Sequence, residues 1–279
     1  VTYGRNWELN PYHFDLDFSP NPGSESKIFQ TQESRGQEFR FSSIEGGVWD
    51  WAAGAAYGDS EVQGNTTRSF FIPLPPQFGG GFAPVTTTTD YSLNEESYSL
   101  FGQLTYNGID SIGIHFGLRG DQYDKSLIRS AFGLSGPVPN INESADYSFI
   151  SPRAGIDFEL SDSSLIYVNS GIAYKPGGYS AFIDNPQLAQ FNEEQSWTKE
   201  IGLKKRWLDD KVRTNFSIFH NNIDDYQVER SLVATDYAIL NADEARSYGA
   251  EIELSAEIFS GVTLEGSLGK TTTELTNYT

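Results

Sequence analysis

The chain has 279 residues, no cysteine and a formal net charge of −19 at pH 7. The missing thiols exclude disulfide bonds and cysteine-ligated metal sites, and the acidic balance excludes nucleic acid as a partner, because nucleic-acid binding needs a basic surface. No run of about 18 apolar residues occurs, which excludes a membrane-spanning helix.

Alternation of apolar and polar residues recurs along the chain and predicts strands, with almost no helical periodicity. In chain order we expect eleven strands, at about 2–18, 35–44, 48–58, 92–107, 112–123, 148–159, 164–174, 197–207, 212–228, 244–258 and 262–275. The stretch 112–121 is the clearest, because its even-numbered residues from Ile112 to Leu118 are apolar and its odd-numbered residues are glycine, histidine or charged. Such faces, over about 9–11 residues, suit a tilted strand that crosses a bilayer.

Aromatic residues stand at the ends of the predicted strands. Trp49 and Trp51 open the strand at 48–58 and Tyr57 closes the same face, while Tyr98 and Tyr106 bracket the next apolar face. Rings at both ends of an apolar band form the aromatic girdle of a membrane barrel. The alternative is a β-sandwich whose aromatic residues fill a core.

The predicted connections alternate between short and long. Short turns rich in glycine, aspartate and serine stand at 45–47, 108–111, 161–163, 209–211 and 260–261. Long polar loops are expected at about 19–34, 59–91, 124–147, 175–196 and 229–243. Short periplasmic turns with long extracellular loops are typical of outer-membrane barrels, and a sandwich would not keep this alternation.

Strand parity and direction predict that the barrel is incomplete. Bacterial single-chain barrels have an even number of strands, and eleven strands that begin by pointing outward also end outward, at Thr279. Val1 stands where a start methionine is missing, so we expect the chain to follow a removed signal peptide or to begin inside a longer protein. The expected organisation is a single partial barrel domain over residues 1–279.

Six segments resemble, in order, the β-barrel of TonB-dependent outer-membrane receptors. They are Gln37–Ser43 followed by Trp49, Ser99–Tyr106 followed by Gly117–Arg119, Ser151–Arg153 with Tyr167–Asn169, Tyr174–Tyr179, Glu200–Lys204, and Asn241–Ala242 with Ala245–Glu251. The fifth segment, for example, reads EIGLK where the family has ElGlK. No single segment is specific, and the resemblance rests on their shared order over most of the chain.

The resemblance implies an all-β, antiparallel up-and-down transmembrane barrel of about 22 strands, of which this chain holds about 11, with a plug that fills the lumen. By that pattern the plug domain and the final strands are absent from this chain. The implied protein is a receptor of the bacterial outer membrane and not an enzyme, and no cofactor is implied.

The function that the resemblance implies is active uptake of a scarce ligand, most often a ferric siderophore, with energy supplied through TonB. Expected partners are the receptor's own plug, the TonB complex acting through that plug, a ferric-siderophore-like ligand, and outer-membrane lipid and lipopolysaccharide. The alternatives are a passive porin-like outer-membrane channel and a soluble β-rich carbohydrate-binding or adhesin module.

No catalytic or metal-binding set is expected. The three histidines, His13, His115 and His220, lie on different predicted strands, and none has a second histidine at ligand spacing. We interpret His115 as a hydrated residue of the barrel wall.

Ligand contacts are expected in the outward loops, where aromatic rings offer flat faces and cations could meet an anionic chelate. The candidates are Arg68, Phe70, Phe71, Phe78 and Phe82 in one loop, and Tyr174, Lys175, Tyr179 and Phe182 in another. The alternative for these residues is that the loops pack on one another or contact lipopolysaccharide. Four charged residues on polar strand faces, Arg119, Arg153, Glu251 and Glu253, are expected to face the lumen and contact the plug.

Overall fold

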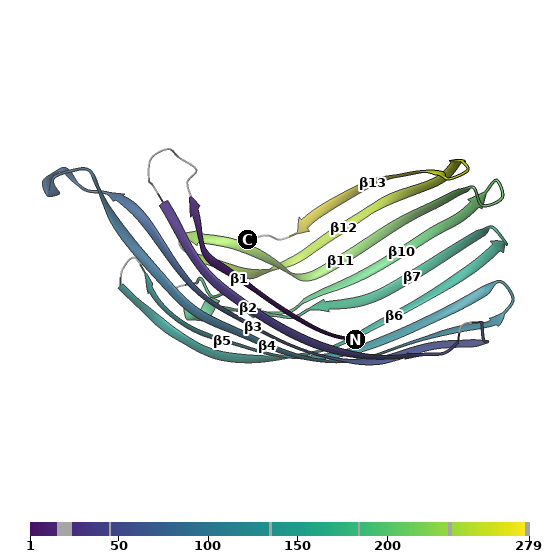
Figure 1. Ribbon diagram of the computed structural model, residues 1–279, viewed down its shortest axis with the longest axis horizontal. Helices are drawn as coiled ribbons and strands as arrows, with labels where there is room; N and C mark the ends of the chain where they lie inside the picture. Colours follow the sequence, from purple (N-terminus) through teal and green to yellow (C-terminus); the bar gives the residue numbers. More distant parts are fainter. Residues whose placement is uncertain (16–23, 45, 134–135, 184, 234–235, 277–279) are drawn as a thin grey trace.

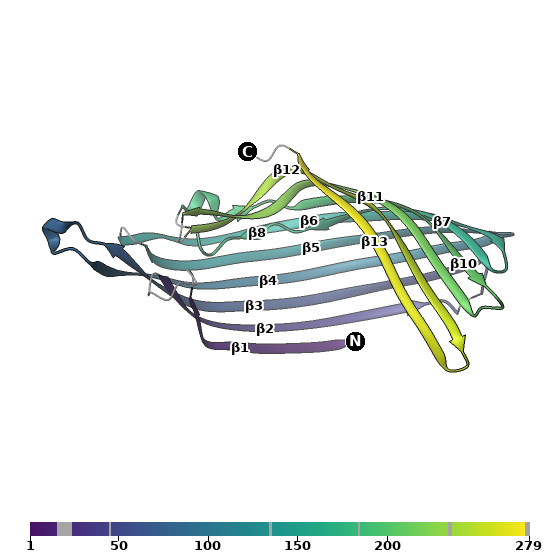
Figure 2. The same cartoon turned by 90° about the horizontal axis from the view of Figure 1, so that it is seen from above.

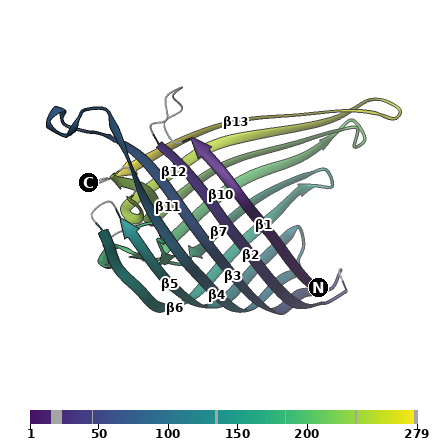
Figure 3. The same ribbon diagram turned by 60° about the vertical axis from the view of Figure 1, so that its left-hand side comes forward.

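The computed structural model describes residues 1–15, 24–44, 46–133, 136–183, 185–233 and 236–276. Eleven long strands form one antiparallel sheet that curves into a trough, with β1 and β13 at its edges (Figure 1, Figure 3). The strands, in sheet order, are β1 (Thr2–Asp15), β2 (Ser24–Ser42), β3 (Trp49–Pro73), β4 (Phe82–Ile109), β5 (Ile112–Gly133), β6 (Gly136–Ser161), β7 (Ser164–Lys175), β10 (Glu194–Trp207), β11 (Val212–Val233), β12 (Asp236–Phe259) and β13 (Val262–Thr276).

Four short elements complete the described structure. They are η1 (Pro76–Phe78), η2 (Pro186–Leu188), and the two-stranded sheet of β8 (Gly178–Tyr179) and β9 (Gln190–Phe191). Among the described residues, no helix is long and apolar enough to cross a membrane. The up-and-down order of the eleven strands confirms the predicted fold and excludes a β-sandwich, which needs two large sheets packed face to face.

The strand register separates two faces of the sheet. Leu104 pairs with Phe116 across β4 and β5, whereas their neighbours Gln103 and Gly117 pair on the opposite face. Phe116 is 55% exposed and Leu118 on the same face is 57% exposed. A continuous exposed apolar face of this kind is the outward, lipid-facing surface of a membrane barrel, so the polar face is the inner one.

Tight turns join the strands at one end of the trough (Figure 2). Ile109 pairs with Ile112 and Phe259 with Val262, so two residues make each of these turns. Ser111 and Gly261 have positive φ angles of 63° and 83°, and the register shifts beside each turn, as in hairpins whose turn is followed by a left-handed residue in a bulge. The short turns predicted at 108–111 and 260–261 are confirmed.

The described residues of the long connections at the other end are mostly strand, so the prediction of long polar loops in place of strands is wrong for 59–91, 124–147 and 229–243. The β3–β4 ladder, for example, continues without a register shift from Tyr57↔Tyr98 to Pro73↔Phe82, and this hairpin projects far beyond its neighbours (Figure 1). The predicted loop at 19–34 is strand from Ser24 onward, and its residues 19–23 lie outside the described residues.

The reason for this difference is physical. Outside the bilayer both faces of a strand meet polar surroundings, so the apolar–polar alternation that marks a strand disappears while the backbone ladder continues. The segment between β7 and β10 is the exception, because it leaves the ladder after Lys175 and rejoins it at Glu194.

Buried apolar residues gather at this outer end. The hydrophobic cluster among the described residues comprises Tyr91, Leu127, Ile141, Tyr179, Ala181, Ile183, Ala189 and Ala238. It joins β4, β5, β6 and β12 to the segment between β7 and β10. Leu127 lies on the same face of β5 as Gly117, so this segment packs on the inner face of the trough.

Candidate functional site

The inner face at the level of the apolar band carries hydrogen-bonded charges. Arg119 on β5 donates from Nε to both carboxylate oxygens of Asp121, at 2.9 Å each, and from a terminal nitrogen to Ser99 Oγ at 2.8 Å. The guanidinium groups of Arg119 and Arg40 each lie 5.6 Å from the centre of the Phe101 ring. These contacts hold the two arginines against the wall, with Arg119 still exposed.

Arg153 on β6 lies on the same face, because its register partner on β5 is Gly117, two residues from Arg119. It donates a hydrogen bond to Gln103 Oε1 on β4. A side chain at Gly117 would collide with the Arg153 stem, so the glycine makes room for the arginine to lie along the sheet.

A polar hollow of about 560 Å³ lies beside Arg153. Within it, His115 Nε2 is 2.7 Å from Asp157 Oδ2 and His115 Nδ1 is 3.1 Å from Thr105 Oγ1. Glu200 and Lys204 line the same hollow, so it contains both signs of charge. In the described residues no group of three histidine or acidic side chains could hold a metal ion, and the hollow suits polar contact with a complementary surface.

Glu251 and Glu253 lie on the inner face of β12. Their register partners on β11 are Ser217 and Asn215, and Asn215 Nδ2 donates to Glu253 Oε2 at 3.0 Å. The structure therefore places all four predicted lumen residues on the inner face, where each is exposed. Their contact with a plug stays a prediction.

The predicted ligand residues of the β3–β4 hairpin divide between its two faces. Phe71 and Phe82 share the outward face, because Phe82 pairs with Pro73, two residues from Phe71. Arg68 and Phe70 point to the inner face. Phe78 ends η1 at the hairpin tip, and its side chain lies outside the described part of the structure.

The predicted residues near the β7–β10 connection contact other parts of the protein. The ring of Phe182 lies 5.3 Å from that of Tyr91 and 5.0 Å from the guanidinium of Arg68. Tyr174 stacks on Phe149 with ring centres 4.9 Å apart, and Lys175 is exposed. The structure thus brings together Arg68 and Phe182 from the two predicted loops, and it does not gather all nine candidates into one surface.

Tyr179 is buried, with 7% of its surface exposed. Its hydroxyl has no hydrogen-bond partner among the described residues. Burial is the main cause that raises the pKa of Tyr179 to about 12. Its side chain is therefore neutral at physiological pH and belongs to the packing of the outer end.

Two further residues of this region escaped the sequence analysis. Arg129 on β5 is 2% exposed and donates to the carbonyl oxygens of Ile183 and Pro139. Gln227 on β11 is 9% exposed and donates from Nε2 to the carbonyl oxygen of Pro176 at 3.1 Å. Arg129 could have been noticed in the sequence, because it lies two residues from Leu127 on the same face of its strand. Nothing in the sequence distinguishes Gln227.

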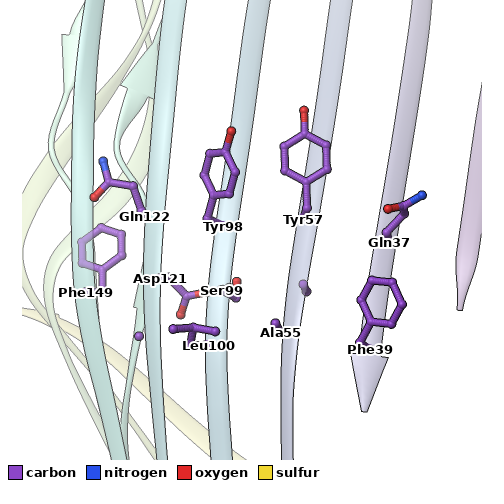
Figure 4. Close-up of a pocket in the computed structure, with 12 residues that line it drawn as sticks. Gln37, Phe39, Ala55, Tyr57, Tyr98, Ser99, Leu100, Asp121, Gln122 and Phe149 are labelled. Atoms are coloured by element: carbon purple, nitrogen blue, oxygen red, sulfur yellow. Dashed lines mark hydrogen bonds between the residues drawn. The ribbon is translucent and has the colours of Figure 1, made fainter.

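A separate groove of about 630 Å³ opens on the apolar, outward face. Tyr57 and Tyr98 stand side by side there with their hydroxyls pointing the same way, above Phe39 and Leu100 (Figure 4). The two tyrosine rings are 5.1 Å apart. These tyrosines belong to the predicted aromatic girdle, and the groove lies apart from the polar inner face.

Comparisons with known proteins agree with this architecture. A family model described as TonB dependent receptor-like, beta-barrel matches residues 1–279. The chain is 23% identical over 190 residues to the ferric-pyoverdine 358 receptor of Pseudomonas putida, which covers 66% of this chain and 22% of that receptor. It is 25% identical over 122 residues to the ferric-pyoverdine M114 receptor PbuA of Pseudomonas sp. (strain M114), which covers 44% of this chain and 14% of PbuA.

Among solved structures, the ferric yersiniabactin uptake receptor FyuA from Yersinia pestis resembles the chain with a TM-score of 0.78 and 18% identity, over 92% of this chain and 38% of FyuA. This likeness shows the fold. The chain spans less than half the length of each of these three proteins. Because the family model matches the whole chain, the chain belongs to the TonB-dependent receptor-like β-barrel family, a family of outer-membrane transport receptors and not of enzymes.

Proposed function

We propose that this chain forms part of an outer-membrane receptor that takes up a ferric siderophore with energy supplied through TonB. The observation that carries the proposal is the family match over residues 1–279, joined to two relatives that are ferric-pyoverdine receptors. The described sheet of eleven strands stays open, which supports a barrel of more strands and a lumen wide enough for an iron chelate.

The two faces of the sheet suggest the partners of the whole receptor. The inner face, with Arg119, Arg153, Glu251 and Glu253, would contact a plug that fills the lumen and that TonB acts upon. Lipid and lipopolysaccharide would cover the outward face, including the groove beside Tyr57. The plug and the strands that close the barrel would lie in parts of the protein beyond this chain.

The proposed function is tested by deleting the gene and measuring uptake of radioactive iron supplied as ferric pyoverdine and as other ferric siderophores under iron limitation. We expect the deletion to abolish high-affinity uptake of one siderophore class, and restoring the gene to recover it only in cells with functional TonB. Unchanged uptake of every siderophore in the deletion strain would refute the proposal. Uptake that persists without TonB would instead support the passive, porin-like channel.

The plug contact is tested by replacing Arg119 and Arg153 together with alanine. If these side chains contact a plug, the double variant should change the rate of uptake at least about threefold while the barrel still assembles, because a lost charged contact is worth about 1 kcal/mol or more. Arg35→Ala is the control, because Arg35 is an exposed arginine on the outward face. Equal uptake by the double variant and the control would contradict the contact.

A further inference from the structure

The wall of the trough is interrupted at its outer end. The last pair between β6 and β7 is Arg153↔Gly171, although β6 extends to Gly136. On the other side, the last pair between β10 and β11 is Gln195↔Asp224, although β11 extends to Val233. The β5–β6 and β11–β12 hairpins therefore rise on either side of a position where the hydrogen-bonded ladder has no strand.

The described residues 176–183 and 185–193, which we call the strap, fill this position. Toward β6, Tyr147 Oη donates to the carbonyl oxygen of Phe191 at 3.3 Å. Toward β11, Gln227 Nε2 donates to the carbonyl oxygens of Pro176 at 3.1 Å and Asn192 at 2.9 Å, close to the two ends of the strap. The strap is thus bonded to both hairpins that flank the interruption.

Beyond the interruption the strap packs on the inner face of the sheet. Ile183 and Ala189 are fully buried, in one cluster with Leu127 of β5, Ile141 of β6 and Ala238 of β12. This buried apolar packing extends from the β5–β6 hairpin to the β11–β12 hairpin. The strap is therefore a second layer of the wall and differs from a loop that stands free in water.

Arg129 fastens the middle of the strap. Its side chain is 2% exposed, and its two terminal nitrogens donate to the carbonyl oxygens of Ile183 in the strap and Pro139 in β6. The planar guanidinium presents donors in a fixed fork, which a lysine cannot reproduce. Removing it would leave the carbonyl group of the fully buried Ile183 without this donor, which is costly.

We infer that the strap is a fixed inner wall of the outer mouth, fastened by Arg129, and that Arg129 controls ligand affinity as a positioning residue without touching the ligand. This inference rests on the proposed uptake function. It follows that the strap stays packed when ligand is bound, because releasing it would open the buried cluster and expose a buried arginine. The passage for the ligand must then lie beside the strap.

This chain contains no cysteine, so once any cysteine in the rest of the receptor is replaced by serine, an introduced thiol reports on its own position in the outer membrane of living cells. Single thiols are introduced by Ala189→Cys, at a buried position of the strap, and by Gln187→Cys, at an exposed one, and both are labelled with a membrane-impermeant maleimide. We expect Ala189→Cys to react at least about tenfold more slowly than Gln187→Cys, with and without ferric pyoverdine, because a packed segment opens rarely. Equal labelling of the two thiols, or rapid labelling of Ala189→Cys once ferric pyoverdine is added, would overturn the fixed wall.

The role of Arg129 is tested by adding Arg129→Leu to each reporter. Labelling of Ala189→Cys should rise at least about tenfold while that of Gln187→Cys stays unchanged, because the strap loses its central hydrogen bonds. The matched control is Arg230→Leu, which removes an exposed arginine of β11 and should change neither rate. If Arg129→Leu leaves Ala189→Cys protected, the fastening role is refuted.

Two further measurements address a variant that fails to assemble and the effect of Arg129 on ligand affinity. If Arg129→Leu fails to assemble, Gln227→Ala is used instead, because it removes the side-chain hydrogen bonds near both ends of the strap. It should raise the labelling of Ala189→Cys, and unchanged labelling would refute the inference. In an assembled Arg129→Leu receptor, the KM for ferric pyoverdine uptake should rise at least about fivefold with a maximal rate within about twofold of the parent, as expected when binding geometry alone is lost. A labelling change with unaltered uptake would overturn the affinity role, and because labelling needs no uptake, this outcome is distinct from a failure of the proposed function.

Discussion

At the scale of single residues, glycines on the inner face lie against aromatic rings of neighbouring strands. Gly54 on β3 pairs with Phe101 on β4, and a Cβ atom at Gly54 would lie 2.5 Å from the ring and 2.6 Å from the carbonyl oxygen of Phe39. The missing side chain lets the ring lie against the sheet, where Arg40 and Arg119 approach it. Such cross-strand pairs of glycine and aromatic residues are a known way to stabilise a curved sheet.

Gly54→Ala should therefore destabilise the barrel by about 1–3 kcal/mol, because the backbone carbonyl of Phe39 cannot move aside cheaply. The temperature at which the folded protein loses its compact mobility in an unheated detergent gel measures this change. Gly120→Ala is the matched control, since its nearest neighbour would be 4.0 Å away. A midpoint for Gly54→Ala equal to that of Gly120→Ala would show that the ring has room to shift.

At the scale of elements, the prediction from sequence succeeded where a strand crosses the membrane and failed outside it. The strand at 112–123 was recognisable because Ile114, Phe116 and Leu118 must meet lipid. Its continuation to Gly133 was not, because beyond Tyr123 the strand has polar or mixed faces and its pairing with Gly136–Tyr147 depends on the partner strand. The loop expected at 175–196 does lie outside the eleven-strand ladder between Lys175 and Glu194, but its packing on the inner face was not foreseen.

The strap should loosen at alkaline pH through Tyr179. Burial raises the pKa of Tyr179 from 10.0 to about 12, so the folded protein keeps the phenol neutral where the unfolded chain ionises. The stabilisation is complete below about pH 10 and is lost as the pH rises through about 12.

We expect the thermal midpoint of the parent to fall more steeply between about pH 9 and about pH 12 than that of Tyr179→Phe, which cannot ionise. The other tyrosines titrate in both proteins, so the difference between the two profiles isolates Tyr179. Parallel profiles would mean that the Tyr179 hydroxyl ionises with the same pKa in the folded and unfolded protein.

At the scale of the whole molecule, the outward apolar band fixes the level of the barrel in the membrane. Leu118 lies within the band, between Gly102 of β4 and Pro152 of β6. Ser126 lies on the same face of β5 but beyond the girdle tyrosine Tyr98, next to Asn94. The two positions therefore differ in depth and share strand and face.

Leu118→Arg should cost about 2–4 kcal/mol, because a charge near the middle of the bilayer is poorly solvated, whereas Ser126→Arg should cost less than about 1 kcal/mol. Refolding into lipid vesicles, followed by denaturant unfolding of the complete receptor, gives both values. Similar losses for the two variants would place the membrane at a different level from the one assigned.

The sequence by itself determined the barrel class, the number of long strands in this chain, the tight turns and the lipid-facing side of the strands with clear alternation. These features are local, because the bilayer demands alternation within one strand and a turn needs only its own residues. The placement of Arg129 against Ile183, 54 residues away along the chain, was decided only by the tertiary structure. The same holds for the outer strand extensions and the packed strap, because each depends on which distant segment provides a partner for a buried polar or apolar group.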